Sequence, residues 1–279
     1  MNPPNSTNPT NPINPINSIP VVILCGGMGT RLREETEYKP KPMVEIGGKP
    51  ILWHIMKHYA HFGFRRFILC LGYKGSVIKE YFLNYEAMSN DFTINLGKGD
   101  HLSYQSNHTE QNFNVTLVDT GLKTMTGGRV KRIQKYIDTD TFMVTYGDGL
   151  ANINIKDLVD FHQGHGKLAT LTATRPPSRF GILELTEENQ VKQFREKVQT
   201  EWINGGFFVF NRHVFDYLDP DSILESGPMG KLAAEKQLMA FRHEGFWIGM
   251  DTYREYEMLN QMWDEGNAPW KFWGDVTST

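Results

Sequence analysis

The stretch from residue 21 to residue 52, VVILCGGMGTRLREETEYKPKPMVEIGGKPIL, constrains the fold more than any other part of the chain. Its first five residues form an aliphatic and β-branched run, which predicts a short strand buried on both faces. Glycines follow at 26, 27 and 29, where a turn can bring backbone N–H groups close to a ligand because no Cβ stands in the way. A buried strand that leads into a glycine turn is typical of a phosphate site in an α/β sheet.

Positive charge is concentrated just after this turn, although the net charge of the whole chain is −3. Prolines at 40 and 42 fix φ on both sides of Lys41 and disfavour a helix before each ring, so we expect this lysine on a stiffened, extended segment. The glycine turn and the cations together predict a site for a polyphosphate. The cations are Arg31, Arg33, Lys39 and Lys41.

Two common phosphate motifs do not fit this stretch. The P-loop pattern requires Lys-Ser/Thr directly after its second glycine, but Gly29 is followed by Thr30 and Arg31. The dinucleotide pattern requires a third glycine three residues after Gly29, where Leu32 stands. An ordinary glycine-rich turn in a Rossmann-like domain therefore stays open as an alternative on glycine spacing alone.

Further motifs carry a family resemblance. The strings GGMGTRL, KPKPM and IGGKPIL closely resemble the opening of the sugar-1-phosphate nucleotidyltransferases, and the resemblance extends from about residue 21 to the C-terminus. The TGGR string and the tryptophan-rich ending resemble the glucose-1-phosphate cytidylyltransferases in particular. The other matching strings are LVDTG with MTGGR (117–129), TYGDG (145–149), TLTATRPPSRFG (170–181), INGGFFVFN (203–211) and GNAPWKFW (266–273).

Two carboxylates follow strand-like runs. Asp148 comes after residues 142–146 between two glycines, and Asp251 comes after residues 246–250. Ligands of open α/β sheets bind at the carboxyl ends of strands, and Mg²⁺ prefers a few carboxylates together with substrate phosphates. Asp-Gly is also a common turn pair, and Asp251-Thr252 fits a helix cap, so the residues alone leave both interpretations open. The resemblance implies that both aspartates bind Mg²⁺.

The resemblance also implies a reaction, in which CTP and α-D-glucose 1-phosphate give CDP-glucose and pyrophosphate. Arg31, Lys41 and Asp148 would be catalytic, and no protein nucleophile is required because the sugar phosphate attacks in line. The triphosphate would contact Thr30, Arg31 and Lys41. The rest of the nucleotide would contact Leu24, Cys25, Gly26, Gly27, Met28 and Gly29 through the backbone, Thr126, Gly127 and Arg129 at the base, and Gly147 at the nucleoside.

Glucose phosphate would be bound by Glu196, Lys197, Asn204 and Gly205. The family triplet Glu-Lys-Pro is here Glu196-Lys197-Val198, so the proline that stiffens the lysine is absent, and an exposed charged strand end is the alternative for this segment. A related pyrophosphorylase that uses dTTP or UTP is the first alternative function, because base choice rests on a few hydrogen bonds. A catalytically silent nucleotide-sugar-binding regulatory protein is the second, and an NAD-dependent dehydrogenase is a distant third.

Length and periodicity predict one α/β domain over residues 19–279, after a disordered Asn/Pro-rich tail at 1–18. We expect a Rossmann-like mixed, mostly parallel sheet flanked by helices, with a smaller antiparallel β elaboration after residue 175. Residues 239–243 and 247–250 are interpreted as paired strands. Residues 84–114 form a polar excursion that is a candidate interface, and since relatives are commonly oligomeric we expect a homo-oligomer.

Residues 50–62 are predicted to form a helix that carries His54, His58 and His61 at a spacing that a metal could use. No carboxylate or cysteine completes a ligand set, so we interpret them as a polar helix face or a subunit contact. The two cysteines stand in apolar runs and are expected to be buried free thiols. Net charge, the absence of a long apolar run and the lack of a signal-peptide pattern predict no nucleic-acid partner, no membrane partner and a cytoplasmic location.

Overall fold

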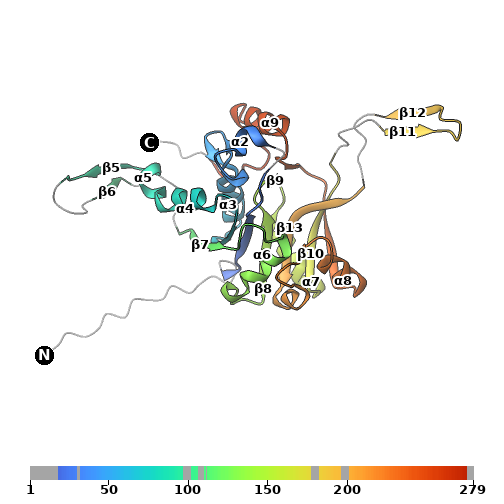
Figure 1. Cartoon of the computed structure of the whole chain (residues 1–279), viewed down its shortest axis with the longest axis horizontal. Helices are drawn as coiled ribbons and strands as arrows, with labels where there is room; N and C mark the ends of the chain where they lie inside the picture. The colour runs from blue at the N-terminus through green and yellow to red at the C-terminus, as the bar shows by residue number, and fades with distance from the viewer. Residues whose placement is uncertain are drawn as a thin grey trace.

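The computed structural model describes residues 18–29, 32–96, 102–105, 110, 112–176, 182–195 and 201–274. The expected tail lies outside these residues except for Ser18. A seven-stranded sheet in the order β14-β10-β13-β8-β1-β4-β7 forms the body (Figure 1). Its strands are β1 (Val21–Cys25), β4 (Arg66–Leu71), β7 (Asn114–Asp119), β8 (Thr141–Tyr146), β10 (Ala169–Thr174), β13 (Ile203–Asn211) and β14 (Leu238–His243).

Strand directions confirm the predicted mostly parallel sheet. β1 lies parallel to β4 and β8, β4 is parallel to β7, and β10 is parallel to β14. β13 is antiparallel to both of its neighbours, β8 and β10. The first residues of β13 therefore lie beside the last residues of β8, at the same edge of the sheet.

The sheet separates two hydrophobic cores. Side chains of β1 alternate between them, with Val21, Ile23 and Cys25 in one core and Val22 and Leu24 in the other. This explains why the opening run is apolar at every position. The first core is covered by α3 (Ile51–His61), α4 (Gly75–Leu83), α7 (Ile155–His165) and α9 (Tyr253–Asp264), and the second by α6 (Thr126–Arg132), η2 (Gln134–Tyr136), η3 (Arg212–Tyr217) and α8 (Pro228–Ala234).

Within the described residues, four two-stranded ribbons supplement the main sheet, which confirms the predicted antiparallel elaboration. β5 (Asp91–Ile94) with β6 (Leu102–Gln105) and β11 (Ile182–Leu185) with β12 (Val191–Arg195) stand away from the body at opposite ends (Figure 1). The other two are β2 (Glu45–Ile46) with β3 (Lys49–Pro50), and β9 (Gly149–Ala151) with β15 (Trp247–Gly249). The remaining short elements are α2 (Arg33–Thr36), η1 (Lys41–Met43) and α5 (Tyr85–Ser89).

The expected pairing of residues 239–243 with 247–250 is wrong. β14 joins the main sheet beside β10, and β15 pairs with β9 instead. Both strands thereby gain long-range partners that a local hairpin would not provide. No helix in the described ranges is long and apolar enough to cross a membrane.

Two of the three histidines of α3 are part of the core. His54 and His58 are 0% and 1% exposed, so the prediction of a polar face is wrong for both. His54 Nε2 lies 2.8 Å from the carbonyl oxygen of Ile46, and its Nδ1 lies 3.3 Å from Nε1 of Trp270. Because an indole N–H only donates, Nδ1 accepts and the ring is neutral with its proton on Nε2. The hydrogen bond from Trp270 to His54 thus joins the tryptophan-rich C-terminal segment to α3.

Burial lowers the pKa of both His54 and His58 to about 4. The unfolded chain takes up these protons near pH 6.5, so between about pH 6.5 and about pH 4 acid favours unfolding by on the order of 1 kcal/mol per pH unit for each ring. We therefore expect the free energy of unfolding, measured by urea titration, to decrease as the pH is lowered from about 6.5 to about 4. The slope should be shallower in His54→Gln and unchanged in His61→Gln, whose side chain is exposed. Equal slopes in wild type and His54→Gln would contradict this assignment.

Candidate active site

A cleft of about 750 Å³ opens at the carboxyl ends of β1 and β8, where β13 begins. Most of the residues singled out in the sequence line it. They are Leu24, Cys25, Gly26, Gly27, Met28, Gly29, Lys41, Thr126, Arg129, Gly147, Asp148, Asn204 and Asp251. Thr30, Arg31, Glu196 and Lys197 lie outside the described residues.

Gly127 and Gly205 are not among the lining residues. A Cβ on Gly127 would stand 2.8 Å from the carbonyl oxygen of Ser222, so this glycine lets α6 pack closely against the loop that follows η3. The carbonyl oxygen of Gly205 accepts a hydrogen bond of 2.6 Å from the Trp247 indole. Gly127 and Gly205 therefore contact other parts of the protein and do not line the cleft.

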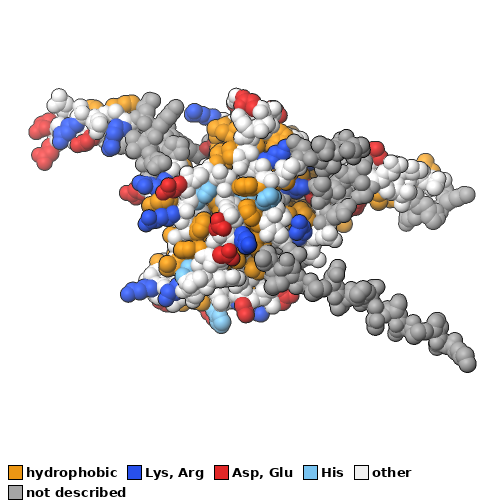
Figure 2. Space-filling view, turned by 180° about the vertical axis from the view of Figure 1, so that it is seen from behind, with side chains coloured by type: hydrophobic (Ala, Val, Ile, Leu, Met, Phe, Trp, Pro, Cys, Tyr) orange, Lys and Arg blue, Asp and Glu red, His pale blue; other side chains and the backbone are white. Residues whose placement is uncertain are grey.

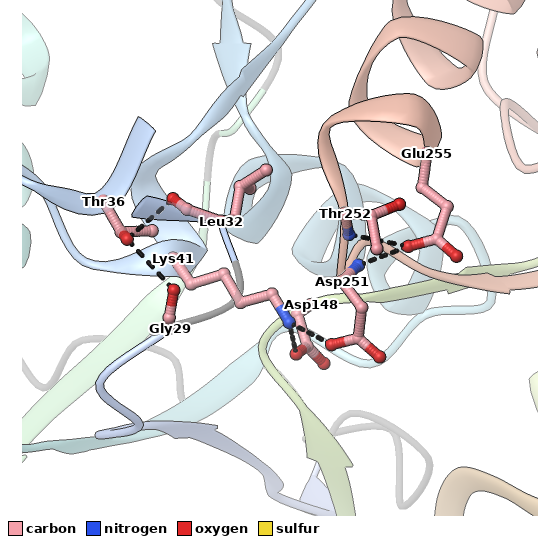
Figure 3. A network of polar contacts seen from close by, with 8 residues as sticks. All are labelled: Gly29, Leu32, Thr36, Lys41, Asp148, Asp251, Thr252 and Glu255. Carbon is pink, nitrogen blue, oxygen red and sulfur yellow. Dashed lines mark hydrogen bonds and ion pairs between the residues drawn. The ribbon is translucent and has the colours of Figure 1, made fainter. Parts of the chain in front are cut away.

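The side-chain hydroxyl of Thr36 holds the glycine turn in place. The Thr36 hydroxyl lies 3.0 Å from the carbonyl oxygen of Gly29 and 2.7 Å from that of Leu32 (Figure 3). Gly29 has φ of +61°, a conformation that other residues seldom adopt. Cys25 reaches the cleft only by its backbone, because its side chain is fully buried and this burial raises the pKa of the thiol.

Arg129 also holds the glycine turn in place, through its guanidinium. It is 4% exposed, and its guanidinium donates to the carbonyl oxygens of Gly26 at 3.0 Å and Leu71 at 2.9 Å and to the Thr120 hydroxyl at 2.7 Å. A Cβ on Gly26 would lie 2.1 Å from the guanidinium carbon, so only glycine fits there. Burial lowers the pKa of this guanidinium. The arginine therefore joins β4 and α6 to the glycine turn.

Lys41 lies at the centre of the cleft. Its Nζ is 2.5 Å from Oδ2 of Asp148 and 2.7 Å from Oδ1 of Asp251 (Figure 3). Burial by itself lowers the pKa of the ammonium, but the two carboxylates outweigh it and raise the pKa above its ordinary value. Three charges that are 107 and 210 positions apart in the chain thus meet at one point.

The expectation that Lys41 lies on an extended segment needs correction. Pro40 is extended, with φ −71° and ψ 153°, but Lys41, Pro42 and Met43 form the 3₁₀ turn η1. A proline fits this turn because the first residues of a helix donate no intrahelical hydrogen bond. The turn points the lysine across the cleft, and Lys41 is only 9% exposed.

Asp251 is aligned by the start of α9. Thr252 is the N-cap of this helix, in a capping box with Glu255. The Glu255 carboxylate accepts from the backbone N–H of Asp251 at 2.7 Å and of Thr252 at 2.8 Å (Figure 3). The cap predicted for this pair therefore falls on Thr252, and the Asp251 carboxylate remains available to face Lys41.

The β9–β15 ribbon brings the two aspartates together. Asp148 directly precedes β9, and only Met250 separates Asp251 from the end of β15. Gly149 pairs with Gly249, and the backbone N–H of Met250 donates to the carbonyl oxygen of Asp148 at 2.9 Å. Gly147 permits this approach, because a Cβ there would lie 2.9 Å from both the carbonyl oxygen of Leu24 and the ring of Pro42.

A divalent cation fits this donor set in part. The described residues contain no group of three His, Cys, Asp or Glu side chains that could hold a metal ion. Two carboxylates nevertheless converge on a single cation, the Lys41 ammonium. Mg²⁺ is commonly held by one or two carboxylates and completes its shell with water and substrate phosphates. A divalent cation bound together with a polyphosphate is therefore compatible with Asp148 and Asp251.

The residue patterns did not single out two polar side chains at this cleft. Tyr146, the last residue of β8, lines the cleft and donates a short hydrogen bond to the carboxylate of Glu225. Glu225 also accepts from the hydroxyl of Thr126 at 2.7 Å. Tyr146 stands inside the TYGDG string and could have been found there, whereas Glu225 lies in a segment with no recognisable motif.

The chain is similar to known nucleotidyltransferases over most of its length. The nucleotidyl transferase family model matches residues 20–276. A glucose-1-phosphate cytidylyltransferase from Salmonella typhi is 53% identical over 256 residues, which cover 90% of this chain and 98% of the relative. A probable glucose-1-phosphate cytidylyltransferase from Bacillus subtilis is 46% identical over 255 residues, with 90% and 99% covered. The crystal structure of HddC from Yersinia pseudotuberculosis complexed with GMP-PN has a TM-score of 0.63 at 24% identity, with 88% of this chain and 99% of that chain covered, and shows the shared fold.

Proposed function

Because the chain belongs to the nucleotidyl transferase family, we propose that it transfers a cytidylyl group from CTP to α-D-glucose 1-phosphate, giving CDP-glucose and pyrophosphate. The substrates are those in the names of relatives that match nearly their whole length. The observation that carries the proposal is the meeting of Lys41, Asp148 and Asp251 beside the glycine turn. A buried ammonium that faces two carboxylates beside a glycine turn is suited to phosphoryl transfer, where charge must be stabilised and a cation can be bound.

The reaction brings together two anions. A phosphate oxygen of glucose 1-phosphate attacks the α-phosphorus of CTP, and the bond from that phosphorus to the bridging oxygen of the β-phosphate breaks, so that pyrophosphate leaves with the electron pair. No proton transfer to a protein base and no covalent intermediate is needed. Catalysis then consists of alignment and of stabilising negative charge.

Lys41 would stabilise charge at the α-phosphate. Its ammonium is preorganised, because η1 and two ion pairs fix it before substrate arrives. The glycine turn would present its backbone N–H groups to the phosphates, with Thr36 and Arg129 holding its shape. A divalent cation, which we take to be Mg²⁺, would be held by Asp148 and Asp251 and would supply further charge neutralisation on the phosphates.

Other proposed contacts are supported by the family resemblance. Thr30 and Arg31 would contact the triphosphate, and Glu196 and Lys197 the glucose phosphate. Thr126, proposed for the base, and Asn204 at the start of β13, proposed for the glucose phosphate, both line the cleft. Residues proposed to bind each of the two substrates therefore line one cleft.

Pyrophosphate release tests the proposed function. The full-length protein would be incubated with Mg²⁺, glucose 1-phosphate and CTP, UTP, dTTP, ATP or GTP in turn. We expect CTP to give the highest rate and CDP-glucose to accumulate in equal amount with pyrophosphate. A higher rate with dTTP or UTP would replace the proposal by a related pyrophosphorylase, and no release with any nucleotide would favour a silent sugar-nucleotide-binding protein.

We also propose that the chain forms a homo-oligomer through its projecting ribbons. In the β5–β6 ribbon, Phe92 pairs with Tyr104 and Ile94 with Leu102, so one face is entirely apolar. These four side chains are 39–53% exposed. The β11–β12 ribbon repeats the arrangement with Leu183 opposite Phe194, and Figure 2 shows hydrophobic side chains on the surface of the projecting ribbons. A two-stranded ribbon is marginally stable alone, so a second copy of the chain is the expected cover.

Charge placed on the apolar face should weaken this association. We expect Phe92→Asp to lower the mass measured by sedimentation velocity, because an aspartate would be desolvated in the contact. Thr93→Asp is the matched control, since Thr93 is the next residue in the same strand and lies on the opposite face, paired with Ser103. A wild-type monomer, or equal masses for both variants and wild type, would show that the ribbon is not the interface.

A further inference from the structure

Glu225 links two residues that line the cleft. Its Oε2 accepts from the hydroxyl of Thr126 at 2.7 Å, and its Oε1 accepts from the hydroxyl of Tyr146. The Nδ2 of Asn204 in turn lies 3.3 Å from the Tyr146 hydroxyl oxygen. Thr126, Tyr146 and Asn204 all line the cleft, whereas Glu225 contacts two of them from outside the lining.

The four residues come from four separate parts of the fold. Thr126 begins α6, Tyr146 ends β8, Asn204 is the second residue of β13, and Glu225 lies in the loop between η3 and α8. That loop is fixed to α6 by the backbone N–H of Leu224, which donates to the Thr126 hydroxyl oxygen at 2.9 Å. The Glu225 carboxylate therefore lies on a loop that is hydrogen-bonded to Thr126, the residue proposed to contact the base.

Hydrogen-bond chemistry determines the direction of each contact. An ionised carboxylate only accepts, so the hydroxyls of Thr126 and Tyr146 must both donate to Glu225. The Tyr146 hydroxyl proton is therefore directed at Glu225, and its oxygen remains an acceptor. Asn204 Oδ1 accepts from the backbone N–H of Gly206 at 2.9 Å, which leaves Nδ2 as the group that faces Tyr146.

The Tyr146 ring is fixed as well as its hydroxyl. Gly206 has φ of +78°, and a Cβ there would lie 2.4 Å from Cδ2 of Tyr146. The ring therefore packs against glycine backbone while its proton is directed to Glu225. One lone pair of the phenol oxygen remains after the contact with Asn204, and Tyr146 is a lining residue of the cleft.

We propose that Glu225 is a positioning residue that holds Tyr146 as a hydrogen-bond acceptor for a hydroxyl of the hexose phosphate and Thr126 in place beside the nucleotide. This inference rests on the proposed function and deepens it, because it assigns the recognition of the sugar hydroxyl to the Tyr146–Asn204 pair. Glu225 touches neither substrate in this arrangement. Its effect is transmitted through the two hydroxyls that it orients.

Steady-state kinetics of isosteric variants test the inference. A hydrogen bond to a charged group contributes about 1.5–3 kcal/mol, so we expect Glu225→Gln to raise KM by about tenfold or more for both substrates with little change in kcat. Tyr146→Phe should raise KM for glucose 1-phosphate alone, and Thr126→Val should raise KM for CTP alone. The Glu225→Gln and Tyr146→Phe effects on glucose 1-phosphate should not add in the double variant, because both remove the same contact.

The chain offers a matched control pair. The Tyr217 hydroxyl donates to the carboxylate of Glu235 in the same way, but neither residue lines the cleft. Tyr217→Phe and Glu235→Gln should leave both KM values unchanged. Glu225→Asp, which keeps the charge and shortens the side chain, should restore part of the loss that Glu225→Gln causes. Melting temperatures would identify any variant that has lost its fold.

The outcomes separate the inference from the proposed function. If wild type releases pyrophosphate with CTP and Glu225→Gln keeps both KM values near those of wild type, the inference is wrong and the proposed function stands. An equal loss in all variants, with kcat and KM both changed and no difference between the two substrates, would also overturn it, because that pattern indicates general disruption. A wild-type chain that shows no activity with CTP would overturn the proposed function and this inference together.

Discussion

Lys41→Ala is expected to lower kcat for CDP-glucose formation by about 10²–10³-fold, the usual cost of removing one preorganised charge from a transition state. Lys41 Nζ is the buried cation at which both aspartates meet, at 2.5 and 2.7 Å. Without it, the extra negative charge that develops during attack on the α-phosphorus loses the stabilisation that we propose for this ammonium. Pyrophosphate release under saturating CTP and glucose 1-phosphate measures the effect.

The fold should tolerate this change. The side chains of Asp148 and Asp251 are 32% and 23% exposed, so water can solvate both carboxylates when the ammonium is removed. The control is Lys156→Ala, which removes an exposed ammonium from α7 and should leave kcat unchanged. Near-normal turnover by Lys41→Ala would refute the role of this lysine.

Much of the fold and of the cleft followed from local patterns. β1 needed an apolar side chain at every position because both faces of its sheet are covered, and that requirement is visible as VVILC. Parallel strands place their carboxyl ends at one edge, so the glycine turn after β1 and Asp148 after β8 were expected together. The approach of Asp251 to Lys41 beside Asp148 required the β9–β15 pairing, which was not predicted.

Long-range pairing accounts for what could not be predicted. The periodicity of residues 238–249 indicates strands but does not identify their partners, and two distant strands, β10 and β9, proved to be those partners. His54 has the helical spacing of an exposed residue, and only the C-terminal segment that covers it, with Trp270, makes it part of the core. Burial by a distant segment leaves no local signal.

Glu225 illustrates the same limit within the cleft. It is a charged residue in a loop, where an exposed carboxylate needs no explanation, and its significance comes entirely from partners 99 and 79 positions away. Asn204 and Tyr146 are joined by strand pairing between β13 and β8, since Phe207 lies opposite Thr145. A hydrogen-bonded network of this kind becomes visible only when the strand order is known.

Asp148→Asn is expected to lower kcat by about 10²–10³-fold, as large a loss as Asp148→Ala, because the chemistry depends on the charge of this residue. The amide can still accept a hydrogen bond from Lys41 but is a poorer ligand for a divalent cation. The variant should therefore need a higher Mg²⁺ concentration for half-maximal rate, and calorimetric titration of Mn²⁺ into the protein with CTP should show weaker binding. Asp160→Asn, on the exposed surface of α7, is the control.

The same variant should shift the pH dependence of the rate. Burial lowers the pKa of the Lys41 ammonium, and Asp148 is the first of the two carboxylates that counteract it. Without that charge the pKa of Lys41 falls, so the lysine loses its proton at a lower pH and the alkaline limb of the kcat profile moves toward neutrality. If Asp148→Asn kept the wild-type profile and the wild-type Mg²⁺ requirement, Asp148 would act through its hydrogen bond alone, and the assignment of a metal-binding role to it would be wrong.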